Sequence, residues 1–323
     1  MNYLPQTRVL GGSDWGCAAT KTYPFDCIAF DRYGLRVNLY APHKLLGRTY
    51  YSSAPYATDG PVFCENNSVS QAALADLTSL LRETKSRYFL IKARANFFAE
   101  RAENIVVDLS KTTYSLDISA GTSHIWNKCM NATRRNETTR ALKSSMTYAW
   151  GTSNLLNDYW QVVTRCWRDL GTPTHSKKFY ENLLVELGNS AAIIVIYFEG
   201  HAVATALTVV RGDTMHHPFA YSIKEHRKLF ANNLLYWKII TRACEQGLQW
   251  FDMGRSTKMQ GTSFFKESWG ARPVQLFYNY LLAPGIEVPD TDSPVMRIAV
   301  KAWTKLPLGV ANALGPHFIR GVL

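Results

Sequence analysis

Apolar and polar positions in the second half of the chain alternate with the periods of strands and helices. Three apolar runs separated by Gly-containing turns predict neighbouring antiparallel strands over 191–198, 202–210 and 215–221. An amphipathic helix should follow, capped by Asn232 or Asn233 and closed by Gly247. After it we expect a short strand, a short helix and a final strand over 249–253, 262–269 and 274–282.

The first 115 residues show the pattern of strands and turns around one helix. Their helix is predicted over 69–85, where Ala73, Leu77 and Leu81 recur at helical spacing. A hairpin is expected within Cys27–Ala41, and buried strands are expected over 88–93 and 105–109. Between the two halves the pattern is helical over 123–144, 155–170 and 177–187.

This order of elements defines the expected fold class. Three antiparallel strands, a crossover helix, a strand, a helix and a strand match the core of the GNAT acyltransferase fold, which is a mixed sheet with a cofactor cleft. We therefore expect an α/β protein with mixed sheets and two tandem GNAT-like domains. The predicted boundaries are 1–150 for the first domain, 151–283 for the second and 284–323 for a tail with an amphipathic helix over 295–305, which should pack on the first domain.

Composition narrows the class of protein. The chain has 323 residues, enough for two domains, and its 36 Lys and Arg against 25 Asp and Glu give a net charge of +11. Such a balance indicates an anionic partner: a nucleotide-bearing cofactor, RNA or a lipid surface. Six scattered cysteines, no signal-peptide pattern and no run long enough to span a membrane predict a cytoplasmic protein with free thiols. We expect no metal site, because the adjacent His216 and His217 would face opposite sides of a strand.

The densest polar cluster begins at the end of the strand predicted over 249–253 and continues into the next helix. It comprises Asp252-Met-Gly-Arg-Ser-Thr-Lys258, Gly261-Thr262-Ser263 and Lys266. Its glycines allow close backbone approach to a ligand, and its hydroxyls and cations at a helix start favour an anion. The alternative is a solvated loop with Arg255 paired to Asp252. Expected to act in catalysis are Lys266, Asp252 and Arg255. Expected to bind substrate or cofactor are Gly254, Ser256, Lys258, Gly261, Thr262, Asn233, Arg227, Arg134, Arg135 and Tyr221, although Arg134 and Arg135 also fit a solvated helix face.

Five motifs in order resemble the FemAB family of tandem-GNAT transferases, which is related to the enzymes that add amino acids to peptidoglycan precursors. They are Leu170-Gly-Thr-Pro173, Asn233-Leu-Leu-Tyr-Trp237, Phe251-Asp-Met-Gly-Arg-Ser256, Phe265-Lys266 and Trp269-Gly-Ala271. Together with the ending Leu306–Pro316, they look like the branch of FemAB-related proteins associated with PEP-CTERM/exosortase systems.

The resemblance implies attack of an amine on an activated ester or thioester, with no metal and no tightly bound cofactor. It implies an amine-bearing cell-envelope precursor or exopolysaccharide as acceptor. In acyl-CoA GNATs a glycine-rich R/Q-x-x-G-x-G/A segment precedes the crossover helix and holds pyrophosphate, whereas the corresponding stretch here, 227–233, has no glycine. Acyl-CoA therefore fits less well as donor than aminoacyl-tRNA or a carrier-bound acyl group.

Two further expectations concern other classes of function. The charge and the glycine-free segment also fit a non-catalytic module that binds RNA or an anionic surface on a degenerate GNAT scaffold. The basic amphipathic stretch in the tail also fits peripheral contact with anionic lipid at the inner membrane.

Lys266 is expected to serve the chemical step rather than folding.

Overall fold

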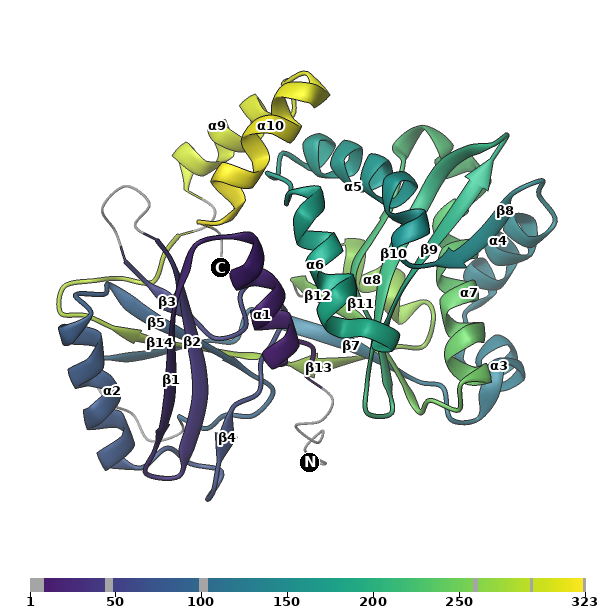
Figure 1. Cartoon of the computed structure of the whole chain (residues 1–323). Helices are drawn as coiled ribbons and strands as arrows, with labels where there is room; N and C mark the ends of the chain where they lie inside the picture. The colour runs from purple at the N-terminus through teal and green to yellow at the C-terminus, as the bar shows by residue number, and fades with distance from the viewer. Residues whose placement is uncertain (1–8, 44–48, 99–103, 258–260, 291–292, 322–323) are drawn as a thin grey trace.

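The computed structural model describes residues 9–43, 49–98, 104–257, 261–290 and 293–321, whose strands form two mixed sheets side by side (Figure 1). The first sheet runs in the order β1 (Phe25–Arg32), β2 (Leu35–Pro42), β3 (Tyr51–Ser52), β5 (Tyr88–Ala93), β14 (Phe277–Leu282), β6 (Ile105–Asp108), with β4 (Phe63–Cys64) beside β2. The second runs β13 (Arg272–Gln275), β7 (Lys111–Asp117), β12 (Trp250–Thr257), β11 (Thr214–Ser222), β10 (His201–Arg211), β9 (Ala191–Phe198), β8 (Thr147–Gly151).

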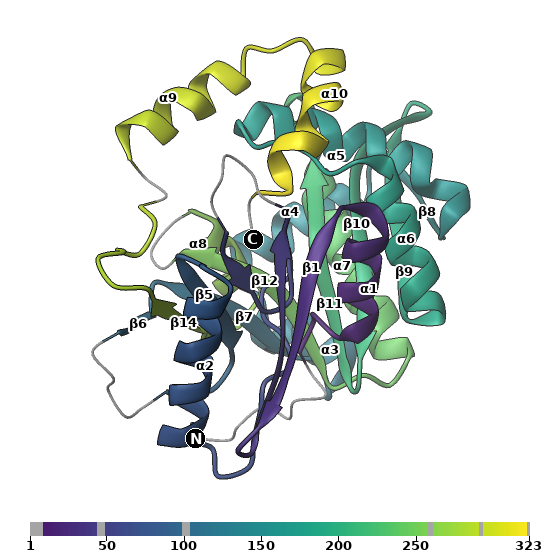
Figure 2. The same cartoon turned by 60° about the vertical axis from the view of Figure 1, so that its left-hand side comes forward.

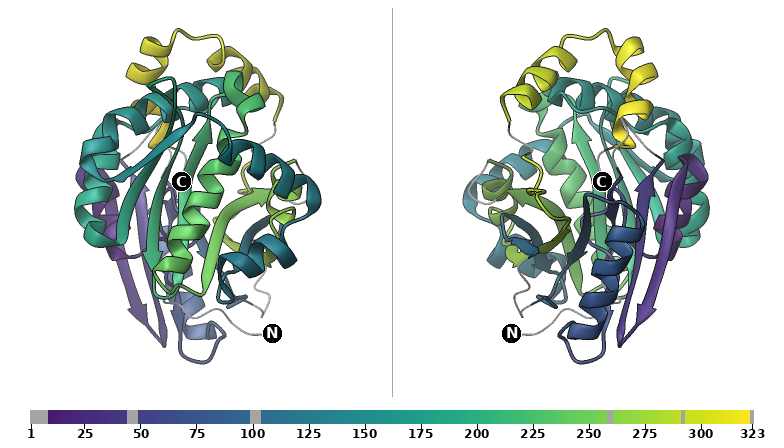
Figure 3. Two further views of the ribbon diagram at one scale, coloured as in Figure 1. Left: turned by 90° about the vertical axis from the view of Figure 1, so that its right-hand side faces the viewer. Right: turned by 90° about the vertical axis from the view of Figure 1, so that its left-hand side faces the viewer.

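The helices cover these sheets on different faces. The first sheet with α2 (Gln71–Glu83) is called the first unit here, and the second sheet with its helices the second unit. In the second unit, α5 (Leu156–Leu170) and α6 (Lys177–Leu187) lie on one face, and α7 (Ala231–Glu245) lies on the other (Figure 3). The remaining helices are α1 (Ser13–Thr22), α3 (Gly121–His124), α4 (Ala132–Leu142), α8 (Gly261–Glu267), α9 (Pro294–Trp303) and α10 (Leu308–Ile319).

Both sheets follow the same plan. In the first, β1, β2 and β3 are antiparallel, β3 is parallel to β5, and β14 and β6 follow antiparallel. In the second, β9, β10 and β11 are antiparallel, β11 is parallel to β12, and β7 and β13 follow antiparallel. A helix crosses between the parallel strands in each case, α2 in the first unit and α7 in the second. The structure thus repeats one strand order in two sheets whose sequences show no repeat.

The two units exchange a strand. β14 fills the place beside β5 although it follows β13 of the second unit, and β7 fills the equivalent place beside β12 although it follows β6 of the first. The division between the sheets therefore falls between β6 and β7, not at Gly151 as predicted. The predicted single strand over 274–282 is likewise two strands, which turn at the buried Leu276 into different sheets.

Apolar clusters fill the faces of both sheets. One joins α1, α5 and α6 to the second sheet around Trp15 and Phe179, another lies under α7, and a third lies between α2 and the first sheet. The sequence did not predict α1, which brings the fully buried Trp15 from the start of the chain into the core of the second unit. The predicted cap of α7 is also wrong, because the helix starts after Phe230 in a left-handed conformation and has no side-chain cap.

The C-terminal helices pack where the sequence did not predict. α10 lies against α5 of the second unit (Figure 2). From the first unit, the hydroxyl of Tyr50 donates to the carbonyl of Gly321. The tail thus rests mainly on the second unit rather than on the first. Among the described helices, none has both the length and the apolar character needed to cross a membrane.

Candidate active site

The parallel strands β11 and β12 separate part of the way along their length. They pair only from Thr214 with Trp250 to His216 with Asp252. Beyond this point β12 also loses register with β7, at Gly254, whose φ of 73° is a left-handed conformation that favours glycine. After this irregularity the end of β12 still pairs with β7, from Arg255 to Thr257, but no longer with β11, which leaves space between the two parallel strands.

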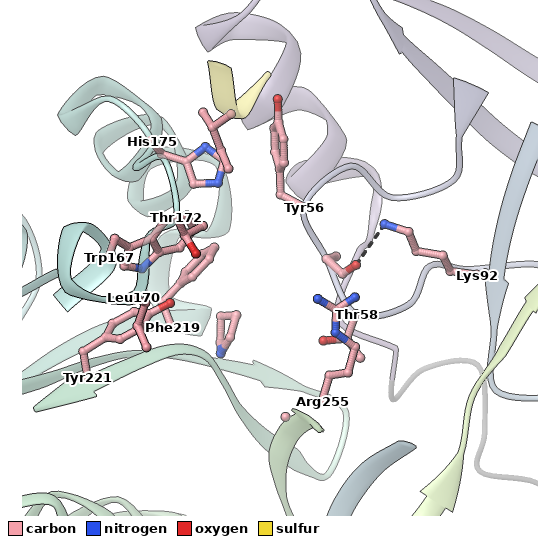
Figure 4. A pocket seen from close by; sticks show the side chains of 14 residues that line it. Tyr56, Thr58, Lys92, Trp167, Leu170, Thr172, His175, Phe219, Tyr221 and Arg255 are labelled. Carbon is pink, nitrogen blue, oxygen red and sulfur yellow. Dashed lines mark hydrogen bonds between the residues drawn. The ribbon is translucent and has the colours of Figure 1, made fainter. Parts of the chain in front are cut away.

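A cavity of about 310 Å³ lies between the units, where the separating strands of each face one another. Lys92 comes two positions after the last residue of β5 that pairs with β3, and Arg255 comes three positions after the last residue of β12 that pairs with β11. Figure 4 shows the two sides of this first cavity. The side chains of His175, Trp167, Phe219 and Tyr221 line one side. The cations Lys92 and Arg255 lie on the other side, together with Tyr56 and Thr58.

A second cavity of about 330 Å³ adjoins the first on the side of α7 and α8. Both cavities are lined by Leu170 and Tyr221, so these two side chains stand at the junction. Three cations line the second cavity: Lys224, Arg227 and Lys266. Lys224 and Arg227 lie in a turn of 3-10 helix that precedes α7. Asn232, Gly261 and Thr262 line it as well, so the predicted Gly261 and Thr262 do lie at a cavity.

The first cavity carries positive charge. The guanidinium of Arg255 donates to the hydroxyl of Tyr278 at 3.1 Å and makes no ion pair within the described part of the chain. The ammonium of Lys92 donates to two carbonyls, of Ala57 at 3.3 Å and Ala54 at 3.5 Å. Burial, together with the charge of Arg255, lowers the pKa of Lys92 to about 7. An anionic group would be favoured in this cavity.

Lys266 lies buried at the base of the second cavity, on α8. Its ammonium donates to the carbonyls of Gly254 and Arg255 at 2.7 and 3.1 Å and to the hydroxyl of Ser256 at 2.9 Å. Burial lowers the pKa of Lys266 to about 8, and the nearby Arg255 contributes. Lys266 thus holds the strand end that separates the two cavities, and Ser256 is an acceptor for it.

Asp252 is not at either cavity. Its carboxylate accepts from Arg94 at 2.6 Å, from Thr113 at 2.6 Å and from the backbone N–H of Gly254 at 2.8 Å. Although burial alone would raise it, the charge of Arg94 holds the pKa of Asp252 well below its usual range. Arg94, which also pairs with Asp59, is therefore the partner of Asp252, in place of the Arg255 considered from sequence.

Arg134, Arg135 and Asn233 line neither cavity. The guanidinium of Arg134 donates to Glu137 at 2.6 Å and to Asn233 at 3.1 Å, and it stacks over the ring of Phe265. Arg135 donates to backbone carbonyls of the preceding turn. Arg134 thus joins α4 to α7 and α8, whereas Arg135 holds the turn that precedes α4, so neither belongs to a fully solvated helix face. Their role in ligand binding stays a prediction. Lys258 lies outside the described residues.

The first unit contributes cavity residues that the sequence analysis missed. Lys92 has a signal that could have revealed it, since it is a lysine inside an otherwise apolar strand. The second unit adds His175, which lies two positions after the Leu170–Pro173 motif and stacks on Phe179, with ring centres 4.1 Å apart. Burial lowers the pKa of His175 to about 3, so its imidazole is neutral at physiological pH. Within the described residues no group of three His, Cys, Asp or Glu side chains is placed to hold a metal.

In each unit the sheet is mixed, and its two parallel strands separate beside a crossover helix. Two copies of this arrangement define a tandem GNAT fold. The sequence profile of the family described as acetyltransferase (GNAT) domain matches residues 128–267, which lie wholly in the second unit. The fold class predicted from the sequence is thereby confirmed.

Solved structures share this fold over most of the chain. FemX is 13% identical, with 86% of this chain and 94% of FemX covered and a TM-score of 0.62. L-PGS from Bacillus licheniformis is 14% identical, with 87% and 90% covered and a TM-score of 0.56. A tandem GNAT protein from the clavulanic acid biosynthesis pathway is 9% identical, with 83% and 86% covered and a TM-score of 0.52. No curated protein matches the sequence. The matched domain and the fold support an acyltransferase.

Proposed function

We propose that the chain transfers an acyl or aminoacyl group from an activated ester or thioester to an amine. The observation that carries this proposal is the meeting of two cavities at Tyr221, beside the separated ends of β11 and β12. A transferase with two substrates needs two binding spaces that share one point, where the reacting atoms come within contact distance.

The donor is assigned to the second cavity and the acceptor to the first. The second cavity lies at the start of α7 and carries Lys224 and Arg227, which suit a phosphate-bearing carrier. The first cavity has aromatic walls and Arg255, which suit an acceptor with an anionic group as well as its amine. The glycine-free turn before α7 favours aminoacyl-tRNA or a carrier-bound acyl group over acyl-CoA as donor.

The chemical step joins the two cavities. The unprotonated amine attacks the acyl carbon, the C–N bond forms, and the C–O or C–S bond to the carrier breaks. The proton that the amine loses passes through solvent to the departing oxygen or sulfur, so the carrier leaves as an alcohol or a thiol. Lys266 is proposed to stabilise the oxyanion through its positive charge, since its three N–H groups already donate to the end of β12, and Arg255 is proposed to hold the acceptor. Asp252 is reassigned to positioning, because it is ion-paired and fixes the N–H of Gly254.

We further propose a cytoplasmic role in cell-envelope, peptidoglycan-like or exopolysaccharide synthesis, of the PEP-CTERM-associated kind. This proposal rests on the sequence motifs alone.

A transfer assay tests this assignment with two neighbouring cations. [14C]Alanyl-tRNA or [14C]acetyl-CoA is incubated with the chain and glucosamine as model amine, and label on the amine is counted. Arg227→Gln should raise the KM for the donor about 10-fold or more, because a charge-assisted hydrogen bond is worth roughly 1.5–3 kcal/mol. Lys228→Gln removes the same charge one position on, outside the residues that line the second cavity, and should leave the KM unchanged.

The rival function gives a different result in the same experiment. A module that only binds RNA would transfer no label and would bind uncharged tRNA. Its affinity would fall steeply between 50 and 200 mM salt, and the two variants would weaken it equally. That outcome would overturn the transferase assignment.

A further inference from the structure

The last helices of the chain carry no acidic residue. From 294 to 323 there are four Lys or Arg and no Asp or Glu, so this short segment supplies +4 of the net charge of +11. The two helices α9 and α10 stand at one end of the molecule, above both units (Figures 1 and 2). Charge and position together set this segment apart from the rest of the surface.

α9 exposes an apolar side next to a basic one. Val295 is 77% and Ile298 68% exposed, and Ala302 lies between them around the helix axis. Arg297 and Lys301, four residues apart, form the adjoining basic edge. The helix has no buried residue, although an apolar face of this size is normally covered in a folded protein.

α10 divides its apolar residues between the protein and the exterior. Ala311, Gly315 and Ile319 are buried, and Gly315 is close enough to the backbone of Thr174 that a Cβ there would lie 2.8 Å from its carbonyl oxygen. The neighbouring stripe remains exposed, at 43%, 40% and 53%, along Val310, Leu314 and Phe318. Phe318 meets Trp303 of α9 edge-on, with ring centres 5.7 Å apart, which links the exposed sides of the two helices.

These helices lie at the first cavity. Ile319 of α10 lines it, and Val300 of α9 lies against Gly171, between the lining residues Leu170 and Thr172. Whatever the exposed side of the helices binds will therefore be held beside the first cavity.

We propose that α9 and α10 dock the protein on an anionic bilayer surface, with the first cavity next to the lipid headgroups. An amphipathic helix with an apolar side and a basic edge lies in the plane of the interface, and the acid-free segment is complementary to anionic lipid. A second copy of the chain is a poorer occupant, because a two-fold contact through this face would bring Arg297 and Lys301 close to their own counterparts. The proposal stands independently of the transferase reaction and limits it to an acceptor or donor present at the membrane.

Co-sedimentation of the full chain with vesicles tests the docking. Vesicles of phosphatidylcholine with 30% phosphatidylglycerol should retain the protein, whereas pure phosphatidylcholine should retain much less. Ile298→Asp should reduce the partition coefficient at least 10-fold. Val185→Asp is the matched control, since Val185 is 74% exposed on α6, and it should leave the partition coefficient unchanged.

Charge variants test the electrostatic part. Arg297→Gln with Lys301→Gln should lower the partition coefficient about 25-fold, a factor of about five for each charge at the surface of an anionic membrane. The control pair Lys143→Gln with Lys178→Gln removes the same charge from exposed sites elsewhere and should change it less than two-fold.

Three results would overturn the proposal: no retention by anionic vesicles, equal loss in the variants and their controls, or a dimer in light scattering that Ile298→Asp converts to a monomer. The last result would make this face an interface between copies of the chain. None of the three affects label transfer to a water-soluble amine, so the docking and the transferase reaction are judged separately.

Discussion

Replacing Lys266 by Met should lower the turnover of label transfer by 10²–10³, because an ammonium placed at a developing oxyanion is worth about 3–4 kcal/mol in the transition state. The substitution should also lower the melting temperature. It leaves the carbonyls of Gly254 and Arg255 without their buried donor, and each unmade hydrogen bond of this kind costs about 1–3 kcal/mol. The expectation that Lys266 serves chemistry and not folding is thus modified by its contacts.

Ser256→Ala separates the two effects of Lys266. This variant keeps the ammonium and removes one of its three acceptors, so stability should fall slightly while turnover stays within about three-fold of wild type. Both variants are assayed with the donor that the wild type uses, at a temperature well below their melting points. Turnover near that of wild type in Lys266→Met, with a lowered melting temperature, would restrict Lys266 to holding β12.

Arg94→Met should be the most destabilising single substitution that we predict. The guanidinium of Arg94 joins Asp59 of the first unit to Asp252 of the second, and all three side chains are almost fully buried. Removing it leaves two buried carboxylates without their counter-ion, which costs about 3–5 kcal/mol. The measurement is the urea midpoint of unfolding. Arg32→Met provides the control, since Arg32 pairs with Asp76 at 2.7 Å on the surface, and its midpoint should stay nearly unchanged.

The pH dependence of stability should reveal the same ion pair, between Arg94 and Asp252. The pKa of Asp252 is lower in the folded than in the unfolded chain, so its stabilising contribution is present above the unfolded pKa, about 4, and is lost as pH falls below it. Stability should therefore decline on acidification more steeply in wild type than in Asp252→Asn. Equal slopes, or equal midpoints for the Arg94 and Arg32 variants, would contradict the role of this ion pair.

The sequence predicted local structure better than long-range pairing. The hairpin within Cys27–Ala41, the helix near Leu77 and the strands β9 to β11 follow from apolar periods and turn residues close in the chain, and the structure confirms them. β14 could not be assigned to its sheet, because no glycine or proline marks a break at Leu276 and its partner β5 lies nearly 190 positions away.

In the candidate site, too, features carried by a local motif were predicted better than contacts between distant residues. Gly261, Thr262 and Lys266 of the predicted motif lie at a cavity, and their roles in binding and catalysis stay predictions. The partner of Asp252 could not be predicted, because Arg94 is 158 positions distant and no local pattern couples them. Arg134 looked exposed from its polar surroundings, yet it is stacked on Phe265, which only the packing of α4 on α8 brings near.

The exchange of β7 and β14 has a consequence for how the protein unfolds and how it can be divided. A single cut between β7 and β8 would leave the first fragment without β14, the strand beside β5, and the second fragment without β7, the strand beside β12. Each fragment would expose unpaired backbone in the middle of a sheet, where pairing with other chains is favoured. Neither half is therefore an independent module, and loss of either sheet removes an inner strand from the other. The two units should melt in one cooperative transition despite their separate cores.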